Sequence, residues 1–271
     1  FAVKIEGRTK RGDLDSEVKI MKVLGELQGE ADRVYGKPFK GQYAQNKLYT
    51  VMKLKEGNEL FEELYMGKKR GAPHKSLPDS QRLLLAIKAA EAIKVLHDKN
   101  IIHADIKPEN FMANIKGDNI VIGAIDFGFS MMLAPGQDKI LGAAKGSPIY
   151  CAPEIVQIIN GNVYGRNPAT FSKASDIYSI GKMFEHDFGL KMGEDFYRRI
   201  LNPDPKMRPT MPQLLDELYI KLAVQPNLSS EVKMMADNYL RERKINPQVF
   251  RDAQERRDGQ MLTASVQSAN S

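Results

Sequence analysis

The sequence has little that would place the chain outside a reducing compartment or inside a membrane. Its single cysteine, Cys151, cannot form an intrachain disulfide, so a fold independent of oxidation and a reducing compartment are expected. No apolar run approaches the roughly 18 residues of a membrane-spanning helix, and the first residues show no signal-peptide pattern. Positive charge is also limited: 40 Lys and Arg against 34 Asp and Glu give a net charge of +6, too weak and scattered to indicate a nucleic-acid partner.

The composition is otherwise that of an ordinary globular protein. Apolar residues make up 42% and charged residues 27% of the chain, values typical of soluble globular proteins. The 271 residues are enough for one large domain or for two lobes that share a cleft.

Residues 103–110, with the sequence HADIKPEN, place three chemically distinct side chains in one loop. Asp105, Lys107 and Asn110 supply a carboxylate, an ammonium group and a carboxamide, after a long helical segment and before an apolar run. Phosphoryl transfer needs an acceptor for the hydroxyl proton, a cation for the developing charge and an oxygen ligand for a hard metal ion. The pattern therefore indicates phosphoryl transfer, with Asp105 and Lys107 as catalytic residues and Asn110 as a metal ligand.

A second motif, Asp126-Phe127-Gly128, lies farther along the chain, between an apolar run and a loop. The carboxylate of Asp126 could reach Mg²⁺ (or Mn²⁺) from the other side of the same cleft, which makes it the second expected metal ligand. Either motif alone is a weak signal, because short motifs often occur by chance. Together, and in this order, they resemble the catalytic and metal loops of eukaryotic-type protein kinases, and Lys-Pro-Glu-Asn resembles the Ser/Thr branch. The resemblance implies ATP as the phosphoryl donor.

Residues 1–5 are apolar or β-branched except for Lys4, and they predict a strand. They resemble the kinase strand whose lysine holds the α- and β-phosphates of ATP, with Ala2 against the adenine. In the family, two strands and a glycine-rich loop precede this lysine. The sequence is therefore expected to be a fragment or to omit upstream residues.

Residues 15–24 carry apolar side chains at helical spacing and predict an amphipathic helix. They resemble the family pattern EIxIMKxL, which implies that Glu17 orients Lys4 and that Met21 packs behind the site. The interval between Lys4 and Glu17 is several residues shorter than the family usually shows. A solvated helix glutamate is the alternative interpretation of Glu17.

A strand predicted over 47–52 leads into a segment that resembles the hinge between the two kinase lobes. The resemblance implies further nucleotide contacts on both sides of the adenine. They are Met52 as the gatekeeper, Lys53 and Lys55 through their backbones, Glu59 toward the ribose or a basic substrate side chain, and Met112 on the other face of the adenine.

The segment from Asp126 to Glu154 is rich in Gly, Ala and Pro and predicts an irregular loop. Its end, residues 146–154, resembles the GTxxYxAPE end of a kinase activation segment. The resemblance implies that Ser147 hydrogen-bonds near the catalytic residues. Cys151 lies in the same stretch and is interpreted as a small packing residue, because no base is apparent beside it.

The usual phosphorylation switch is missing from this loop. In many kinases an arginine precedes the catalytic aspartate and pairs with a phosphorylated loop residue; here that position is Ala104. Between Phe129 and Gly146, Ser130 is the only hydroxyl residue, and it lies too close to the metal loop to act as the switch. A phosphate on this loop would therefore interact about equally with the active and inactive states. We predict that packing alone holds the loop in its active arrangement.

Two later motifs resemble the helical lobe of kinases. Residues 176–181 match DxWSxG with tyrosine for tryptophan, which implies that Asp176 binds the backbone of the catalytic loop. Arg208 occupies the position of the family's buried ion-pair partner for Glu154. The interval between the two motifs is far shorter than usual, so the substrate-docking G helix is predicted to be reduced or absent.

Polar helical segments are predicted over 229–244 and 247–257, past the kinase resemblance. Their basic side chains are Arg241, Arg243, Lys244, Arg251, Arg256 and Arg257. A solvated helical face is the default interpretation, and a docking surface for a protein partner is the alternative. The final residues are rich in Ser, Ala, Gln and Asn and predict disorder.

The predicted fold is α+β: a bilobal protein kinase fold with a small β-rich N-lobe, here missing its first strands, and a mainly helical C-lobe. The predicted boundaries are 1–55 for the partial N-lobe, 56–222 for the C-lobe and 223–271 for a basic helical C-terminal extension. The predicted function is transfer of the ATP γ-phosphoryl group to serine or threonine of protein substrates.

Two other functions compete with this prediction. A pseudokinase would keep the fold as a scaffold or binding module, but it has no need of the complete set of chemistry-bearing side chains. A small-molecule kinase of the aminoglycoside type would lack the Ala-Pro-Glu segment and the motifs at Asp176 and Arg208.

Two further expectations concern substrate and location. Phe129 resembles the bulky residue of serine-preferring kinases, and Glu59 and Glu109 would favour basic residues before the phosphorylated serine through charge pairing. The compact substrate lobe and the Lys- and Asn-rich loops resemble eukaryotic-type kinases that bacterial pathogens deliver into host cells. The predicted location is therefore cytoplasmic, in the host cytosol if the protein is such an effector.

Overall fold

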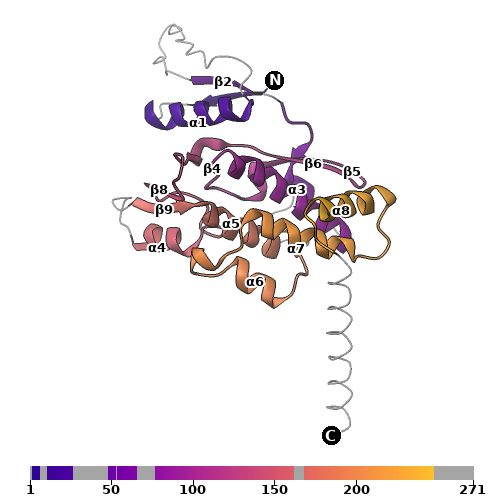
Figure 1. The fold of residues 1–271 in the computed structure, drawn as a ribbon. Helices are drawn as coiled ribbons and strands as arrows, with labels where there is room; N and C mark the ends of the chain where they lie inside the picture. Colours follow the sequence, from indigo (N-terminus) through magenta and orange to yellow (C-terminus); the bar gives the residue numbers. More distant parts are fainter. Residues whose placement is uncertain are drawn as a thin grey trace.

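The structure, a computed structural model, describes residues 2–6, 11–26, 48–52, 54–65, 77–161 and 168–246, with the backbone alone described for 2–6, 11–15, 48–52 and 159–161. The described residues form two parts (Figure 1). The smaller part holds strands β1 (Ala2–Glu6) and β2 (Leu48–Met52) and helix α1 (Arg11–Leu24). The larger part holds the other described strands and helices. This division agrees with the predicted α+β, two-lobed architecture.

β1 and β2 pair antiparallel, with Ala2 opposite Met52 and Lys4 opposite Thr50. Three of the residues predicted to contact the nucleotide therefore lie on this small sheet. The side chains of Ala2, Lys4 and Met52, and the whole of Lys53, lie outside the described residues.

α1 begins at Arg11, earlier than the sequence predicts, and ends in a left-handed glycine. Gly25 has φ 71°, and its N–H donates to the carbonyl of Lys22 (3.1 Å). The N–H of Glu26 donates to the carbonyl of Met21 (2.9 Å). These two bonds form a Schellman motif, which satisfies carbonyls of the last turn and fixes Glu26 at the end of the helix.

A three-stranded antiparallel sheet, in the order β3-β5-β6, lies between the small part and the helices. Its strands are β3 (Asn58–Glu59), β5 (Phe111–Lys116) and β6 (Asn119–Ala124). Side chains alternate along β5: Phe111 and Ala113 are buried, while Met112 is half-buried on the opposite face. The sheet therefore has one face toward the helical core and one face toward the small part.

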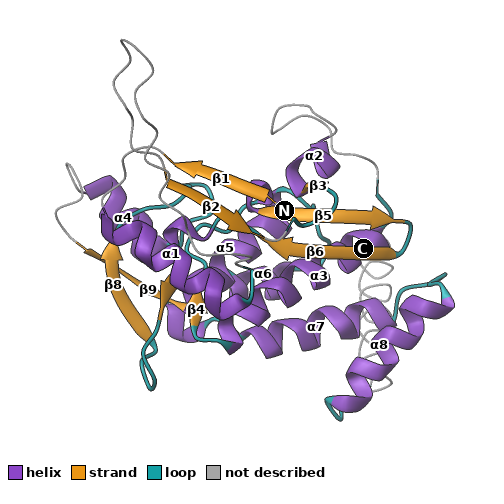
Figure 2. Ribbon diagram, turned by 90° about the horizontal axis from the view of Figure 1, so that it is seen from above, coloured by secondary structure: helices purple, strands orange, loops and turns teal. Residues whose placement is uncertain are grey.

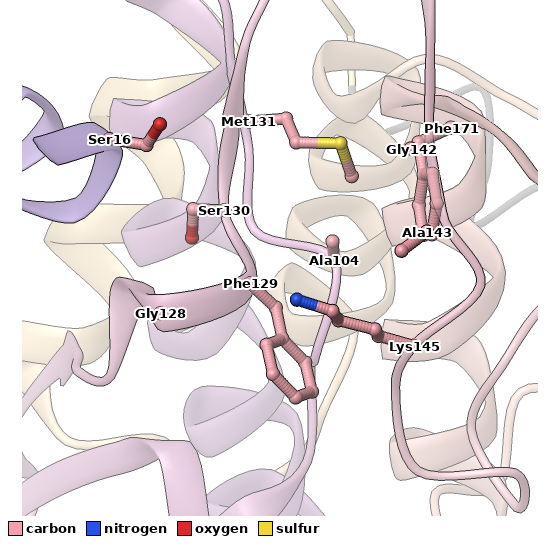
Figure 3. A pocket seen from close by; sticks show the side chains of 10 residues that line it. All are labelled: Ser16, Ala104, Gly128, Phe129, Ser130, Met131, Gly142, Ala143, Lys145 and Phe171. Carbon is pink, nitrogen blue, oxygen red and sulfur yellow. The ribbon is translucent and has the colours of Figure 1, made fainter. Parts of the chain in front are cut away.

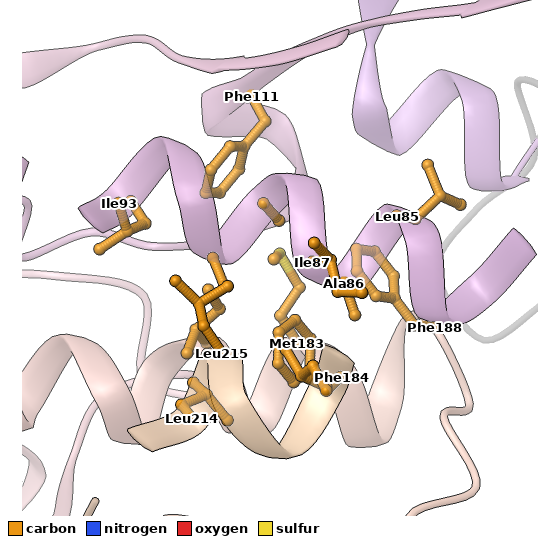
Figure 4. Packing of buried hydrophobic residues seen from close by; sticks show 14 of the residues in the cluster. Leu85, Ala86, Ile87, Ile93, Phe111, Met183, Phe184, Phe188, Leu214 and Leu215 are labelled. Carbon is orange, nitrogen blue, oxygen red and sulfur yellow. The ribbon is translucent and has the colours of Figure 1, made fainter. Parts of the chain in front are cut away.

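α3 (Asp79–Asp98) is the central helix of the larger part, and consecutive residues 83–87 are all buried. A helix buried on every side needs apolar neighbours on every side. It packs against β6 on one face and against α7 (Met211–Ala223) on another. Figure 4 shows Phe111 above α3, with Met183, Phe184, Leu214 and Leu215 below it. Among the described helices, none has both the length and the apolar character that a membrane crossing requires.

The remaining helices surround this core (Figure 2). They are α2 (Leu60–Tyr65), α4 (Pro153–Gly161), α5 (Lys173–His186), α6 (Glu194–Ile200) and α8 (Ser230–Glu242), with the short 3-10 helices η1 (Pro108–Asn110), η2 (Phe127–Phe129) and η3 (Pro205–Met207). One short helix, α6, lies between α5 and Arg208. This agrees with the predicted reduction of the G-helix region.

α8 packs on α7 through stacked rings of Tyr219 and Tyr239, whose centroids lie 3.8 Å apart. Its apolar side is buried at Val232, Ala236 and Leu240. The basic side chains of the helix end, Arg241, Arg243 and Lys244, are exposed, as expected for a solvated face. The predicted segment 247–257 lies outside the described residues.

The segment predicted as an irregular loop contains two strands. β7 (Met131–Met132) pairs with β4 (Ile101–Ile102), and β8 (Lys139–Ala143) pairs antiparallel with β9 (Pro168–Ser172). Figure 2 shows β8 and β9 side by side at one edge of the molecule. The sequence did not predict them, because a Gly- and Ala-containing stretch shows too little apolar alternation to indicate a strand.

Candidate active site

The predicted catalytic loop, residues 103–110, lies between β4 and β5, and its side chains meet around Asp105. The Asp105 side chain is 8% exposed. Its Oδ2 accepts a hydrogen bond from Asn110 Nδ2 (2.9 Å) and forms an ion pair with Lys107 Nζ (2.9 Å). Asn110 Nδ2 also donates to the Asp105 carbonyl (2.7 Å). The three residues predicted from spacing therefore form one connected group.

Ser147 of the activation segment completes this group. Its backbone N–H and its hydroxyl each donate to Asp105 Oδ1 at 3.1 Å, and its Oγ accepts from Lys107 Nζ at 3.1 Å. The predicted hydrogen bonds of Ser147 near the catalytic residues are thus present. They tie the end of the activation segment directly to the catalytic carboxylate.

The loop backbone is held by the buried carboxylate of Asp176 on α5. Asp176 Oδ2 accepts from the N–H of His103 (2.8 Å), and Oδ1 accepts from the N–H of Ala104 (3.0 Å). Ala104 has φ 66°, a left-handed conformation that costs a non-glycine residue about 1–3 kcal/mol unless the surroundings hold it. The predicted role of Asp176 is confirmed. His97 Nε2 also lies 2.9 Å from Asp176 Oδ2, a contact that the sequence analysis did not predict.

The pairing of β5 with β6 brings the metal loop, residues 126–128, beside the catalytic loop. The N–H of Ile125 donates to the carbonyl of Asn110 (2.9 Å), which places the next residue, Asp126, beside the predicted metal ligand. Asp126 has φ 60° and immediately precedes η2 as its N-cap residue. The His103 ring lies edge-on to Phe127, with ring centroids 5.9 Å apart, so His103 packs on the metal loop.

The donor set fits a hard divalent cation. Asn110 is 5% exposed, and both of its side-chain hydrogen bonds use Nδ2, so within the described part of the chain its Oδ1 accepts no hydrogen bond. A buried carboxamide oxygen without a donor needs a cation or a donor from outside the chain. The described residues contain no cluster of three or more His, Cys, Asp or Glu side chains. Two oxygen-bearing residues suit Mg²⁺, which keeps its other positions for water and phosphate oxygens.

The nucleotide side of the site is described in part. On α1, Glu17 is buried at 4% exposure and Met21 at 1%, and the helix packs against η2. A solvated position for Glu17 is therefore wrong. Met112 is half-buried on the face of β5 that is turned toward the small part, and Glu59 on β3 is exposed and pairs directly with it. The backbone of Lys55 has no hydrogen-bond partner among the described residues, which leaves its N–H and C=O free for an adenine edge.

The activation segment ends in a buried, bidentate ion pair. Arg208 donates from its two terminal nitrogens to the two oxygens of Glu154, each at 2.8 Å. The side chain of Arg208 is fully buried, and its remaining donors reach the carbonyls of Asn202, Pro203 and Ala174. The Arg208 guanidinium lies 5.0 Å from the ring centroid of Tyr178. The predicted Glu154–Arg208 pair is confirmed.

A second buried carboxylate was not anticipated from the sequence. Asp187, just after α5, is fully buried and accepts hydrogen bonds from Tyr65 Oη (2.6 Å) and Tyr150 Oη (2.7 Å). Tyr150 belongs to the activation segment and Tyr65 ends α2. The carboxylate therefore joins three segments that are far apart in the chain.

Cys151 lies behind the catalytic aspartate. Burial is the main cause that raises the pKa of its thiol to about 11; the negative charge of Asp105 also raises it, and Lys107 lowers it. The thiol therefore stays protonated at neutral pH. A protonated, buried thiol is a poor nucleophile, which agrees with a packing role.

A cavity of about 170 Å³ lies between α1, the catalytic loop, η2 and the paired strands β8 and β9. Figure 3 shows Ala104 at its wall, where many kinases carry an arginine. Among the described residues that line the cavity, Lys145 carries the only charge, and its Nζ lies 5.4 Å from the ring centroid of Phe129. None of the described residues that line this space is an arginine that could receive a phosphate.

Comparison with known proteins decides the family. A model of the protein kinase domain matches residues 5–186. The chain belongs to the protein kinase family. The similar curated proteins include calcium-dependent protein kinase 34 of Arabidopsis thaliana, 27% identical over 257 residues that cover 82% of this chain and 45% of the plant protein. Myosin light chain kinase A of Dictyostelium discoideum is 33% identical over 135 residues, which cover 50% of this chain and 39% of that protein.

The chain spans less than half the length of these two relatives. Calcium-dependent protein kinase 22 of Arabidopsis thaliana, 32% identical over 173 residues, is matched over 62% of this chain and 31% of its own length. Membership of the protein kinase family confirms the predicted α+β kinase fold. It also agrees with the contacts of Asp105, Asn110 and Asp176 described above.

Proposed function

We propose that this kinase domain transfers the γ-phosphoryl group of ATP to serine or threonine of protein substrates, from an activation segment held in place by packing. The observation that carries the proposal is the connected group around Asp105. Asn110, Lys107 and Ser147 all contact one carboxylate, while the Oδ1 of Asn110 remains without a donor among the described residues. A scaffold protein has no need of this arrangement.

In this proposal Asp105 accepts the proton of the substrate hydroxyl. Both oxygens of the carboxylate already accept from protein donors, so the side chain is held in one orientation. The Ser147 hydroxyl can rotate its proton away from Asp105 Oδ1 to make room for the substrate hydroxyl, and its oxygen then still accepts from Lys107. A substrate hydroxyl can then donate to Asp105 Oδ1, within reach of the Lys107 ammonium group.

Asn110 and Asp126 are the residues that would hold Mg²⁺ in this site. When bound, the ion neutralises charge that develops on the phosphate oxygens. Asn110 would serve both halves of the site, because its Nδ2 orients Asp105 while its Oδ1 accepts no hydrogen bond from the residues that the structure describes. Lys4 and Glu17 would position the phosphates from the small lobe, and Ala2, Met52, Lys53, Lys55 and Met112 would surround the adenine.

Packing supports an activation segment that needs no phosphate. β8 pairs with β9 over five residue pairs, from Lys139 with Ser172 to Ala143 with Pro168. The segment is also anchored by Ser147 on the catalytic carboxylate, by Tyr150 on Asp187 and by the Glu154–Arg208 pair. Because these contacts hold the segment without a phosphate, a loop phosphate would add little differential stabilisation of the active state.

Phosphatase-treated protein is therefore expected to keep most of its transfer activity. The measurement compares initial rates of radiolabelled phosphate transfer from ATP to a generic protein substrate, before and after phosphatase treatment. Asp126→Ala, which removes a metal ligand, provides the blank. A tenfold or greater loss that loop phosphorylation restores would contradict packing as the cause of the active arrangement.

The same site supports a preference for serine and for basic residues before it. Phe129, the bulky residue after the metal loop, is 41% exposed beside the catalytic loop. Glu59 is exposed, and we propose that Glu59 and Glu109 pair with basic side chains of the substrate. Asp187 is not available for such pairing, because it is buried and accepts hydrogen bonds from two tyrosines. The host-cytosol location and a protein partner on the basic C-terminal residues stay predictions of the sequence.

A further inference from the structure

Lys55 lies between β2 and β3, where the sequence resembles the kinase hinge, and its side chain makes a contact that the resemblance does not predict. Lys55 Nζ forms an ion pair with Glu26 Oε1 at 2.8 Å. Both side chains are partly shielded from solvent, at 26% and 21% exposure. The pair therefore joins the hinge to the residue that follows α1.

The stem of Lys55 crosses β6 at a glycine. A Cβ added at Gly123 would lie 2.7 Å from Lys55 Cδ, closer than real Cβ contacts, so any side chain there would displace the lysine stem. Gly123 is the antiparallel partner of Met112, and directly paired residues present their side chains on the same face of a sheet. Lys55 therefore lies on the face of the sheet that carries Met112, the residue predicted to cover the adenine.

Glu26 is fixed to α1 rather than to a free loop. Its N–H donates to the carbonyl of Met21 in the Schellman motif that ends the helix. Met21 and Glu17 are buried on the same helix, which packs against η2 of the metal loop. A shift of Glu26 is therefore expected to shift α1, the helix that carries Glu17.

We infer that Lys55 is a positioning residue for ATP, and that its ion pair with Glu26 sets the hinge backbone and α1 in a common arrangement. The inference rests on the proposed function. The backbone of Lys55 is free for an adenine edge in the described part of the chain, while its side chain holds the end of α1. Breaking the pair should weaken ATP binding more than it slows the transfer step, because Asp105, Lys107 and Asn110 are held by other contacts.

Lys55→Met, which keeps the apolar stem and removes the charge, is expected to raise KM for ATP about threefold to fivefold, as expected for a partly exposed ion pair. The kcat should change less than twofold. Glu26→Gln should give the same split. The double variant should be no worse than either single variant, because both remove one interaction. Steady-state kinetics at varied ATP, with the thermal midpoint of each variant, provide the measurement.

Lys182→Met is the matched control. Lys182 pairs with Glu185 at 2.6 Å and is 19% exposed, but the pair lies within α5 and should leave KM for ATP unchanged. Gly123→Ala, which keeps both charges and displaces the stem, should raise KM as Lys55→Met does. Unchanged KM values in Lys55→Met and Glu26→Gln at parental thermal midpoints, or additive effects in the double variant, would overturn the inference.

The affinity for Mg-ADP, measured by calorimetry, separates this inference from the proposed function. If the parent protein transfers no phosphate, the proposed function fails, and the same threefold to fivefold weakening of Mg-ADP binding in Lys55→Met still supports the positioning role. Equal Mg-ADP affinities in parent, Lys55→Met and Glu26→Gln would refute the positioning role whatever the activity.

Discussion

Asp105→Asn is expected to lower the rate of phosphoryl transfer about a thousandfold, a typical effect for a positioned general base. The asparagine has nearly the same shape and keeps one oxygen, which can still accept from Ser147, while its NH2 group replaces the oxygen that accepts from Asn110. It cannot take up the hydroxyl proton, and it no longer balances the Lys107 ammonium group at 2.9 Å. The measurement is kcat/KM for a protein substrate at saturating ATP, with circular dichroism to confirm the fold.

Asp98→Asn is the control for this change, because Asp98 is an exposed residue at the end of α3 whose side chain accepts from Lys94 at 2.6 Å. It should keep the parental rate. Retention of more than a tenth of the activity by Asp105→Asn would show that another group accepts the proton.

Arg208→Met is expected to lower the free energy of unfolding by about 3–5 kcal/mol, the usual result of removing one partner of a buried ion pair. Among the residues that the structure describes, the change leaves the Glu154 carboxylate with Ser175 Oγ (3.1 Å) as its only donor. It also removes the donors to the carbonyls of Asn202, Pro203 and Ala174. Urea unfolding followed by circular dichroism, with the slope m compared between variants, provides the measurement.

Arg199→Met offers a matched control for Arg208→Met. Arg199 also makes a bidentate pair with a glutamate, Glu217, at 2.5 and 2.6 Å. Its side chain is 52% exposed and that of Glu217 is 28% exposed, so the pair should contribute less than about 1 kcal/mol. Equal losses from the two substitutions would contradict burial as the source of the Arg208 contribution.

The catalytic and metal loops could be predicted from the sequence because their chemistry is local. Asp105, Lys107 and Asn110 lie in one short loop, and the β5–β6 hairpin then returns the chain so that Asp126 comes beside Asn110. Spacing along the chain therefore nearly determined the geometry. The Glu154–Arg208 pair was also predicted, but only from the family resemblance, since no local pattern links positions so far apart.

Contacts between distant segments were the part that the sequence could not supply. Asp187 joins Tyr65 and Tyr150 across 122 and 37 positions of sequence, and a buried carboxylate has no periodicity that marks it in advance. The β8–β9 pairing was missed because pairing of short strands depends on the partner and not on the strand itself. The Lys55–Glu26 pair was missed for a similar reason, since it depends on the space that Gly123 leaves.

The most direct test of the account is the identity of the amino acid that receives the phosphate. The full-length protein is incubated with radiolabelled ATP, Mg²⁺ and a generic protein substrate that contains serine, threonine and tyrosine, and the labelled substrate is hydrolysed for phosphoamino-acid analysis. The account predicts label mainly on phosphoserine, some on phosphothreonine, and none above the level of Asp126→Ala on phosphotyrosine. Label mainly on phosphotyrosine, or no label above that of Asp126→Ala, would contradict it.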